Sequence, residues 1–237
     1  MFPEESPMIT DHVKTIFCNG VANTYEDARR GAKAIGQIMG RPVECFYNNA
    51  HHDLLFGTTT ALAGTGLSLL AAHPLPLMIV GSRSQSLVER RKTQCAAAMA
   101  EKIRTDLQNH PLNQVVLVLH SQGRDIGDLA LRRLSRQERQ RISVVTLGSS
   151  PIAEKAAAKV TNLQQKGDLV PAFMKLRDSA MHLINLNFFP SKREIHSIEG
   201  NGHSLASYLR HPHVQRCLMD EHSRSVQKVA EQAQIKI

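Results

Sequence analysis

Short apolar runs alternate with amphipathic stretches along most of the chain. The residues at 13–20, 42–48, 114–120 and 141–150 form apolar runs that predict strands. The stretches 24–40, 85–109 and 125–139 carry apolar residues at helical spacing and predict helices. The run 114–120 is continuous rather than alternating, which is typical of a strand buried on both faces of a parallel sheet.

The alternation of strand and helix continues towards the C-terminus. Pro151 can open a helix, 159–171 predicts a fifth strand with its loop, and 193–203 predicts a sixth. A helix begins at Ser204–Leu209, and helical periodicity continues over Val214–Ala233. The pattern predicts an α/β fold, with a mostly parallel open sheet and helices on both faces. In such sheets, active groups lie beyond the carboxyl ends of the strands.

Local signals fix the ends of the first helix. Thr24 is a plausible N-cap with Asp27 three residues later, which resembles a capping box, and Gly40 is a plausible terminator. At 237 residues the chain is long enough for one large domain, and we expect a single domain over 1–237. The acidic, proline-containing residues 1–12 predict a flexible N-terminus.

One segment interrupts the alternation. From Leu54 to Ser82 the chain contains no Lys, Arg, Asp or Glu. This uncharged segment is long enough to span a bilayer. Its four glycines, two prolines and three consecutive threonines make it a poor membrane-spanning helix. We therefore predict that 54–82 is an apolar insertion or lid and that the chain has no transmembrane helix. Contact of this segment with a membrane surface remains open.

The composition of the chain limits the kinds of binding partner and the compartment that we expect. The formal net charge is +8, which fits either a soluble basic protein or an affinity for phosphate, anionic lipid or nucleic acid. Lys and Arg are scattered over many segments, and aromatic residues make up only 4% of the chain, so no nucleic-acid partner is expected. The four cysteines show no paired spacing, which favours a reducing compartment. With no conventional signal peptide, we expect a protein that is cytoplasmic or exported without a cleaved signal.

Three residues with catalytic potential follow predicted strands in the order Ser121, Asp168, His203. A serine hydroxyl is a weak nucleophile at neutral pH and needs a base within hydrogen-bond reach. The base in turn needs an acid that fixes its tautomer and stabilises its charged form. This chain order of Ser, Asp and His is that of the α/β-hydrolases.

The motifs around these residues carry a family resemblance over roughly Lys14 to Leu209. The run "HSQGRDIGDLAL" resembles the nucleophile elbow and following helix of the α/β-hydrolase superfamily. The loop "KGDLVP" looks like the aspartate loop of its lipase/esterase-like branch, and "GNGHSLASYL" is similar to that branch's histidine and tyrosine helix. The resemblance implies Ser121 as nucleophile, His203 as general base and acid, and Asp168 as the partner that orients His203.

The resemblance also implies an oxyanion hole and an elbow. The backbone N–H of Gln122 would be one oxyanion donor, and Gly20 or Val21 in the loop after the first strand would supply the second. His120 and Gly123 flank the serine in the elbow. This chain departs from the family at Leu119, where the elbow normally has a small residue. Either Gly123 and Gly127 on the facing helix accommodate Leu119, or the turn is relaxed and Ser121 is badly aimed.

Other residues compete for these roles. Ser121 could be an ordinary turn residue, His196 is a rival base inside a predicted strand, and Asp178 is a rival acid. Asp125 and Asp128 fit better as first-turn acids of a helix. The clusters 51–53 and 211–213 lack the spacing of a known metal site, and the glycines at 64–66 lack that of a dinucleotide site. We expect no metal and no organic cofactor.

These observations predict a serine hydrolase that cleaves an acyl ester or thioester through a Ser121 acyl-enzyme. The apolar segment 54–82 favours a small-molecule or lipid substrate with an apolar acyl group. Two alternatives remain. One is a catalytically inactive binding protein on a hydrolase scaffold, since fold alone never establishes activity. The other is a basic protein that docks on membranes or nucleic acid.

Overall fold

A computed structural model describes residues 7–20, 23–49, 75–168 and 194–234 of the chain. Its centre is a six-stranded sheet with the strand order β2-β1-β3-β4-β5-β6, and every neighbouring pair is parallel. The strands are β1 (Val13–Cys18), β2 (Glu44–Phe46), β3 (Gln114–His120), β4 (Ile142–Leu147), β5 (Lys159–Gln165) and β6 (His196–Ile198). The predicted fold class, a mostly parallel open α/β sheet, is confirmed.

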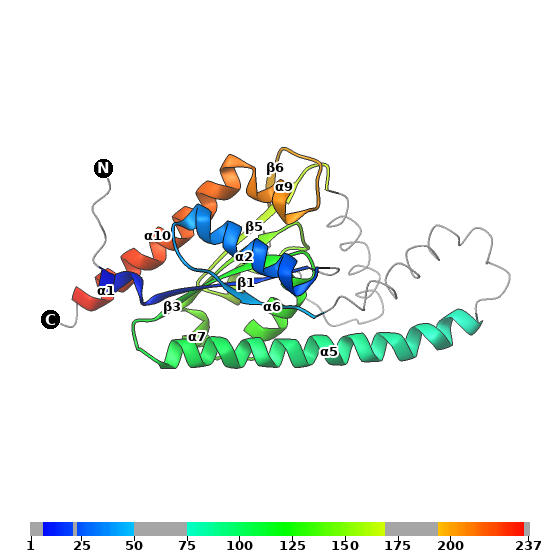
Figure 1. Ribbon diagram of the computed structural model, residues 1–237. Coiled ribbons are helices and arrows are strands. Elements are labelled where there is room, and N and C mark those ends of the chain that lie inside the picture. Colours follow the sequence, from blue (N-terminus) through cyan, green and yellow to red (C-terminus); the bar gives the residue numbers. More distant parts are fainter. Residues whose placement is uncertain (1–6, 21–22, 50–74, 169–193, 235–237) are drawn as a thin grey trace.

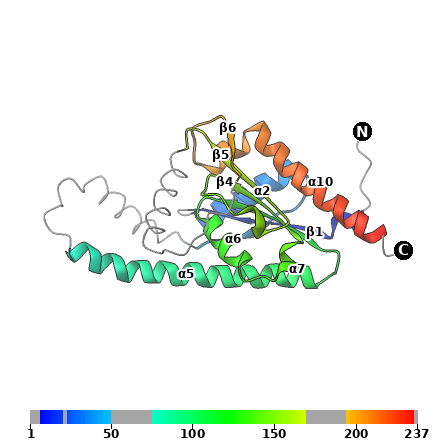
Figure 2. The same cartoon turned by 180° about the vertical axis from the view of Figure 1, so that it is seen from behind.

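Helices cover both faces of this sheet (Figure 1). On one face lie α2 (Tyr25–Met39), α9 (Leu205–Leu209) and α10 (Pro212–Gln234). On the other lie α5 (Leu75–Gln108) and α6 (Gly123–Leu131), and α5 runs below the strands in the reverse view as well (Figure 2). The three layers explain why β3 is continuously apolar. Val116 and Val118 lie in the core beneath α2, α9 and α10, and Val115, Leu117 and Leu119 lie in the core beneath α5 and α6.

The helix α2 begins and ends where the sequence predicts. The Thr24 side chain accepts a hydrogen bond from the Asp27 N–H, and the Asp27 carboxylate accepts one from the Thr24 N–H. This capping box satisfies donors that the first turn of a helix leaves without partners. At the other end Gly40 has φ = 65°, a left-handed conformation that glycine adopts at little cost.

The second half of the chain differs from the prediction in two places. The predicted helix 125–139 is two helices, α6 and α7 (Arg136–Arg139), because Ser135 caps α7 through a reciprocal box with Glu138. After Pro151 there is only a 3-10 turn at Glu154–Ala156 instead of an α-helix. The backbone of Ile152 exchanges two hydrogen bonds with the buried side chain of Asn162 in β5, at 2.9 and 3.1 Å, and these hold the chain after Pro151.

The long helix α5 begins at Leu75 rather than at Gln85. A proline in the first turn of a helix removes no hydrogen bond, so Pro76 is compatible with this earlier start. The last part of the predicted insertion 54–82 is therefore helical, and its residues 54–74 lie outside the described residues. In the described ranges, no helix combines the length and apolar character needed to cross a membrane.

The N-terminal segment contains a short helix, α1 (Pro7–Thr10). Beyond it, the carbonyl of His12 accepts a hydrogen bond of 2.7 Å from the Gln114 N–H, which joins this segment to the first residue of β3. The remaining residues of the predicted flexible N-terminus, 1–6, lie outside the described ranges.

Candidate active site

Ser121 lies at the corner between β3 and α6 with φ = 53°. It is the one non-glycine residue with positive φ in the part of the chain that the structure describes. The corner is held from both sides, because the Ser121 N–H donates to the Leu147 carbonyl at 3.0 Å and the Ser121 carbonyl accepts from the Arg124 N–H at 3.1 Å. A serine in this strained conformation between a strand and a helix has the geometry of a nucleophile elbow.

Two glycines allow the chain to pass close to this elbow. A Cβ atom on Gly20 would lie 2.7 Å from the Ser121 Cβ, and one on Gly123 would lie 2.5 Å from the Cys18 carbonyl oxygen. Contacts this short do not occur between real side chains and backbone, so these positions require glycine. The loop after β1 therefore packs directly against the first turn of α6 and against the serine.

Leu119 fits the elbow because Gly127 faces it. Its side chain is completely buried, and a Cβ on Gly127 would lie 2.3 Å from one of its methyl carbons. The expectation that glycine on the facing helix accommodates Leu119 is confirmed for Gly127. Gly123 contacts the Cys18 and Asn19 carbonyls instead. The larger residue at 119 is thus compatible with the positive φ of Ser121.

His203 connects the serine with Asp168. Its Nδ1 lies 2.8 and 3.1 Å from the two carboxylate oxygens of Asp168, and its Nε2 lies 2.9 Å from the Ser121 Oγ. An ionised carboxylate only accepts hydrogen bonds, so Nδ1 carries the proton and Nε2 accepts from the serine hydroxyl. The Asp168 side chain is fully buried, whereas the His203 side chain is 30% exposed. The structure therefore brings together the three residues that the sequence singles out.

Tyr208, one turn along α9 from His203, contacts the same carboxylate. Its hydroxyl donates to Asp168 Oδ2 at 2.8 Å and accepts from the Gln165 N–H at 3.0 Å. Tyr208 is fully buried, and burial is the main reason that its pKa is raised. The phenol therefore stays protonated, and it holds Asp168 against the end of β5.

His120 holds the loop that carries His203. Its Nε2 lies 2.9 Å from the His203 carbonyl oxygen, and a carbonyl only accepts, so Nε2 bears the proton. Burial lowers the pKa of His120 to about 4, and the imidazole is therefore neutral near pH 7. On the other side of His203, the Gly202 N–H donates to Gln165 Oε1 at 2.9 Å. These two hydrogen bonds fix the backbone on both sides of the histidine.

Two backbone N–H groups beside Ser121 are candidate oxyanion donors. In the described part of the chain, the backbone N–H groups of Gln122 and Gly20 donate to no other group. Gln122 follows the serine directly, and Gly20 packs against it. Val21, the other candidate for the second donor, lies outside the described residues.

The rival base His196 does not join this cluster. His196 is exposed in β6, and Asp178 lies outside the described residues. Asp125 lies in the first turn of α6, as predicted, and pairs with Arg124 at 3.1 Å. Sequence reasoning assigned no role to Asn19 or Asn48, two buried asparagines near Gln122. The only signal for them is that each follows an apolar strand in the sequence.

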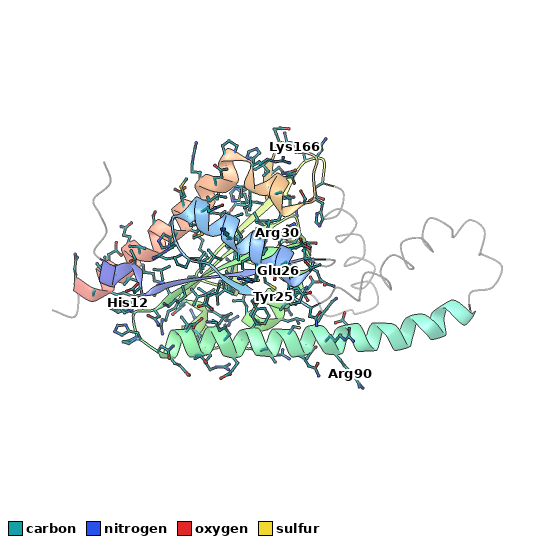
Figure 3. All side chains as sticks on the ribbon, viewed as in Figure 1. His12, Tyr25, Glu26, Arg30, Arg90 and Lys166 are labelled. Carbon is teal, nitrogen blue, oxygen red and sulfur yellow. The ribbon has the colours of Figure 1, made fainter. Side chains whose placement is uncertain are left out.

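A separate cleft of about 700 Å³ runs along α2 and β2. Its lining includes the cationic side chains of Arg29, Lys33 and Arg41, and it contains none of the three clustered residues described above. Tyr25, at one end of this cleft, and Arg30 are both on α2, whereas Arg90 extends from α5 on the opposite side of the sheet (Figure 3).

The chain has a parallel sheet, a strained serine between β3 and α6, and Asp and His after later strands. The fold is α/β-hydrolase-like. No protein-family model and no curated protein matches the chain. A solved structure to which it is similar is Trichoderma reesei cutinase in complex with a C11Y4 phosphonate inhibitor, at a TM-score of 0.42 and 15% identity. The match covers 93% of this chain and 75% of the cutinase chain. At this level of similarity the match carries no argument about activity.

Proposed function

We propose that this protein is a serine hydrolase that cleaves acyl esters or thioesters. The observation that carries the proposal is the continuous hydrogen-bonded series from Ser121 Oγ through His203 to Asp168, with contacts of 2.9 and 2.8 Å. A nucleophile, a base and an acid that orients the base are the parts that acyl transfer through serine requires. The positive φ of Ser121 supports the same proposal, because structural turns rarely place a serine in this conformation.

In the acylation step, Ser121 Oγ attacks the substrate carbonyl carbon while its proton moves to His203 Nε2. The resulting imidazolium lies against the buried carboxylate of Asp168, which stabilises its charge. The carbonyl oxygen becomes an oxyanion, and the N–H groups of Gln122 and Gly20 donate to it. Each such donor contributes about 3 kcal/mol in the transition state. His203 then gives its proton to the departing alcohol or thiol, which leaves an ester on Ser121.

Deacylation repeats these steps with water as the nucleophile. His203 Nε2 takes a proton from the water, the water oxygen attacks the acyl carbonyl, and the proton returns to Ser121 Oγ as the acid leaves. The His203 side chain is 30% exposed, so water reaches part of the imidazole ring. The reaction needs neither a metal nor an organic cofactor.

The substrate class follows from the segment between Leu54 and Ser82. This segment has no charged residue and enters α5, which packs against the same face of the sheet as α6. An apolar segment without charged residues is suited by its composition to contact an apolar acyl chain, so the proposed substrate is a lipid or another ester with a long acyl group.

Labelling with a fluorophosphonate probe tests the proposal. The probe reacts with a serine that is activated by a base, so we expect the purified protein to be labelled and Ser121→Ala and His203→Ala to remain unlabelled. Ser204→Ala is the matched control, because Ser204 caps α9 beside His203 and has no catalytic role. p-Nitrophenyl esters of increasing chain length then test the substrate class, and we expect kcat/KM to rise with acyl length. A folded protein that no probe labels would overturn the hydrolase and favour a binding protein on this scaffold.

A further inference from the structure

Two buried asparagines join the loops that follow β1 and β2. Asn19 and Asn48 are 1% and 3% exposed. The Asn48 N–H donates to Asn19 Oδ1 at 2.7 Å, and the Asn19 Nδ2 donates to the Asn48 carbonyl at 3.3 Å. The parallel ladder between these strands ends at the pair Cys18 and Phe46. The carboxamide of Asn19 therefore continues the pairing beyond the end of the ladder, and we call these two residues the asparagine clasp.

The clasp extends to the elements that carry the oxyanion donors. Asn19 Nδ2 also donates to the Gly20 carbonyl at 2.7 Å. Asn48 Nδ2 donates to the Gln122 side-chain Oε1 at 3.2 Å and lies 3.5 Å from the Asn19 carbonyl oxygen. The peptide group is planar, so a donor on the Asn19 carbonyl also fixes the direction of the Gly20 N–H on the opposite side of the same peptide.

The orientation of every amide in the clasp is determined by its partners. The backbone N–H of Asn48 can only donate, so the oxygen of Asn19 must face it and the nitrogen of Asn19 must face the Gly20 carbonyl. The nitrogen of Asn48 faces the Asn19 carbonyl, so Gln122 must present its oxygen. Asn19 uses both its amide nitrogen and its amide oxygen here, and Asn48 uses its amide nitrogen. At either position a carboxylate of the same shape would place acceptors against acceptors.

We propose that Asn48 and Asn19 are positioning residues that hold the two oxyanion donors, Gly20 and Gln122, at a fixed separation. This inference rests on the proposed hydrolase function. None of these hydrogen bonds of the clasp involves Ser121 or His203. Loss of the clasp should therefore weaken stabilisation of the oxyanion and leave activation of the nucleophile unchanged. A hydrogen bond to an oxyanion loses strength steeply with misalignment, which makes the separation of the two donors critical.

Asn48→Asp is the decisive variant, because it keeps the shape and reverses the hydrogen bonding towards Gln122. We expect kcat to fall by 30-fold or more with KM changed less than 3-fold, as for loss of an oxyanion donor. Asn48→Ala is a second variant, free of the added charge, and we expect a smaller loss of kcat. Asn109→Asp, at an exposed position directly after α5, is the matched control and should retain the wild-type kcat.

A thiono ester separates this role from a merely structural one. Sulfur accepts hydrogen bonds poorly, so an intact oxyanion hole favours the oxygen ester over its thiono analogue. We expect the ratio of kcat/KM for the two esters to fall at least 5-fold in Asn48→Asp and Asn48→Ala. His203→Gln lowers both rates together and should keep the ratio. If the probe labels the wild type but the Asn48 variants keep the wild-type ratio of kcat/KM for the two esters, the proposed role of the clasp is wrong and the hydrolase proposal stands. A wild type that is neither labelled nor active would overturn the hydrolase, and the proposed role of the clasp with it.

Discussion

The hydroxyl of Tyr208 donates a hydrogen bond to Asp168 Oδ2, the same carboxylate oxygen that lies 2.8 Å from His203 Nδ1. Two hydrogen bonds from different elements fix the direction of this buried carboxylate. Because the phenol oxygen also accepts from the Gln165 N–H, Tyr208 connects the end of β5 to the hydrogen-bonded cluster of Ser121, His203 and Asp168.

Tyr208→Phe removes both of these hydrogen bonds. It leaves the Gln165 N–H without its partner in a buried position, so we expect the free energy of unfolding to fall by about 1–3 kcal/mol. We also expect kcat to fall by about 3- to 10-fold, because Asp168 loses one of the contacts that aim it at His203. Urea unfolding and ester hydrolysis measure the two effects, and Tyr25→Phe, at an exposed site, is the control. A variant as stable as the wild type would contradict the bridging role.

Ser121 stores backbone strain that a glycine would relieve. At φ = 53° a Cβ atom lies close to the neighbouring carbonyl, at a cost of about 1–2 kcal/mol. Ser121→Gly and Ser121→Ala both lack the hydroxyl, so the difference between their free energies of unfolding measures the backbone strain at this position. We expect Ser121→Gly to be the more stable of the two by up to about 1 kcal/mol in urea unfolding, because the greater flexibility of unfolded glycine offsets part of the relief. The opposite order would mean that the elbow is not strained.

Leu119 and Gly127 should show strong coupling. Gly127→Ala places a methyl group 2.3 Å from the Leu119 side chain, and overpacking of this kind costs about 1–3 kcal/mol. Leu119→Ala leaves a cavity in the fully buried core and costs about 2–5 kcal/mol. In the double variant the new methyl group occupies part of that cavity. We expect its loss of unfolding free energy to be smaller than the sum of the single losses by about 1 kcal/mol or more. Strict additivity would exclude the proposed packing of the elbow.

His120 makes stability depend on pH. Burial lowers the pKa of its imidazole from 6.5 to about 4 in the folded protein, so the unfolded chain binds a proton at higher pH than the folded chain does. The contribution of His120 is therefore fully present above pH 6.5 and is lost as the pH falls from 6.5 towards 4. At pH 5 the loss is about 2 kcal/mol relative to pH 7.

The variant His120→Gln isolates this contribution. Glutamine does not titrate, so the unfolding free energy of the variant should depend less on pH. Between pH 7 and pH 5 we expect it to fall by about 2 kcal/mol less than that of the wild type. Burial and Arg41 lower the pKa of His222 to about 4 as well, and its contribution has the same sign. His222 remains in both proteins, so it cancels in the comparison. An equal pH dependence in the two proteins would show that His120 is not buried in its neutral form.

The parallel sheet and the first helix were predictable because they depend on patterns within one short segment. The continuous apolar run of β3 requires burial on both faces, and the capping box at Thr24 requires only a residue three positions away. Ser121, Asp168 and His203 follow the strands β3, β5 and β6, and this placement was sufficient to predict that they meet, since parallel strands end at one edge of the sheet. The start of α5, at Leu75 instead of Gln85, and the end of α6, at Leu131 instead of Arg139, were predicted wrongly, and at α6 the cap that Ser135 forms for α7 decides the boundary.

Three features of the site were decided by tertiary structure alone. The sequence left open whether Leu119 fits the elbow or distorts it, and only the packing of Gly127 in α6 against its side chain decides between the two. The asparagine clasp joins Asn19 and Asn48, 29 positions apart, and His120 reaches the His203 carbonyl across 83 positions. Hydrophobic periodicity reports whether a position is buried, and that property is local. Which polar atom meets which partner depends on how separate segments pack together, so no pattern within one segment encodes it.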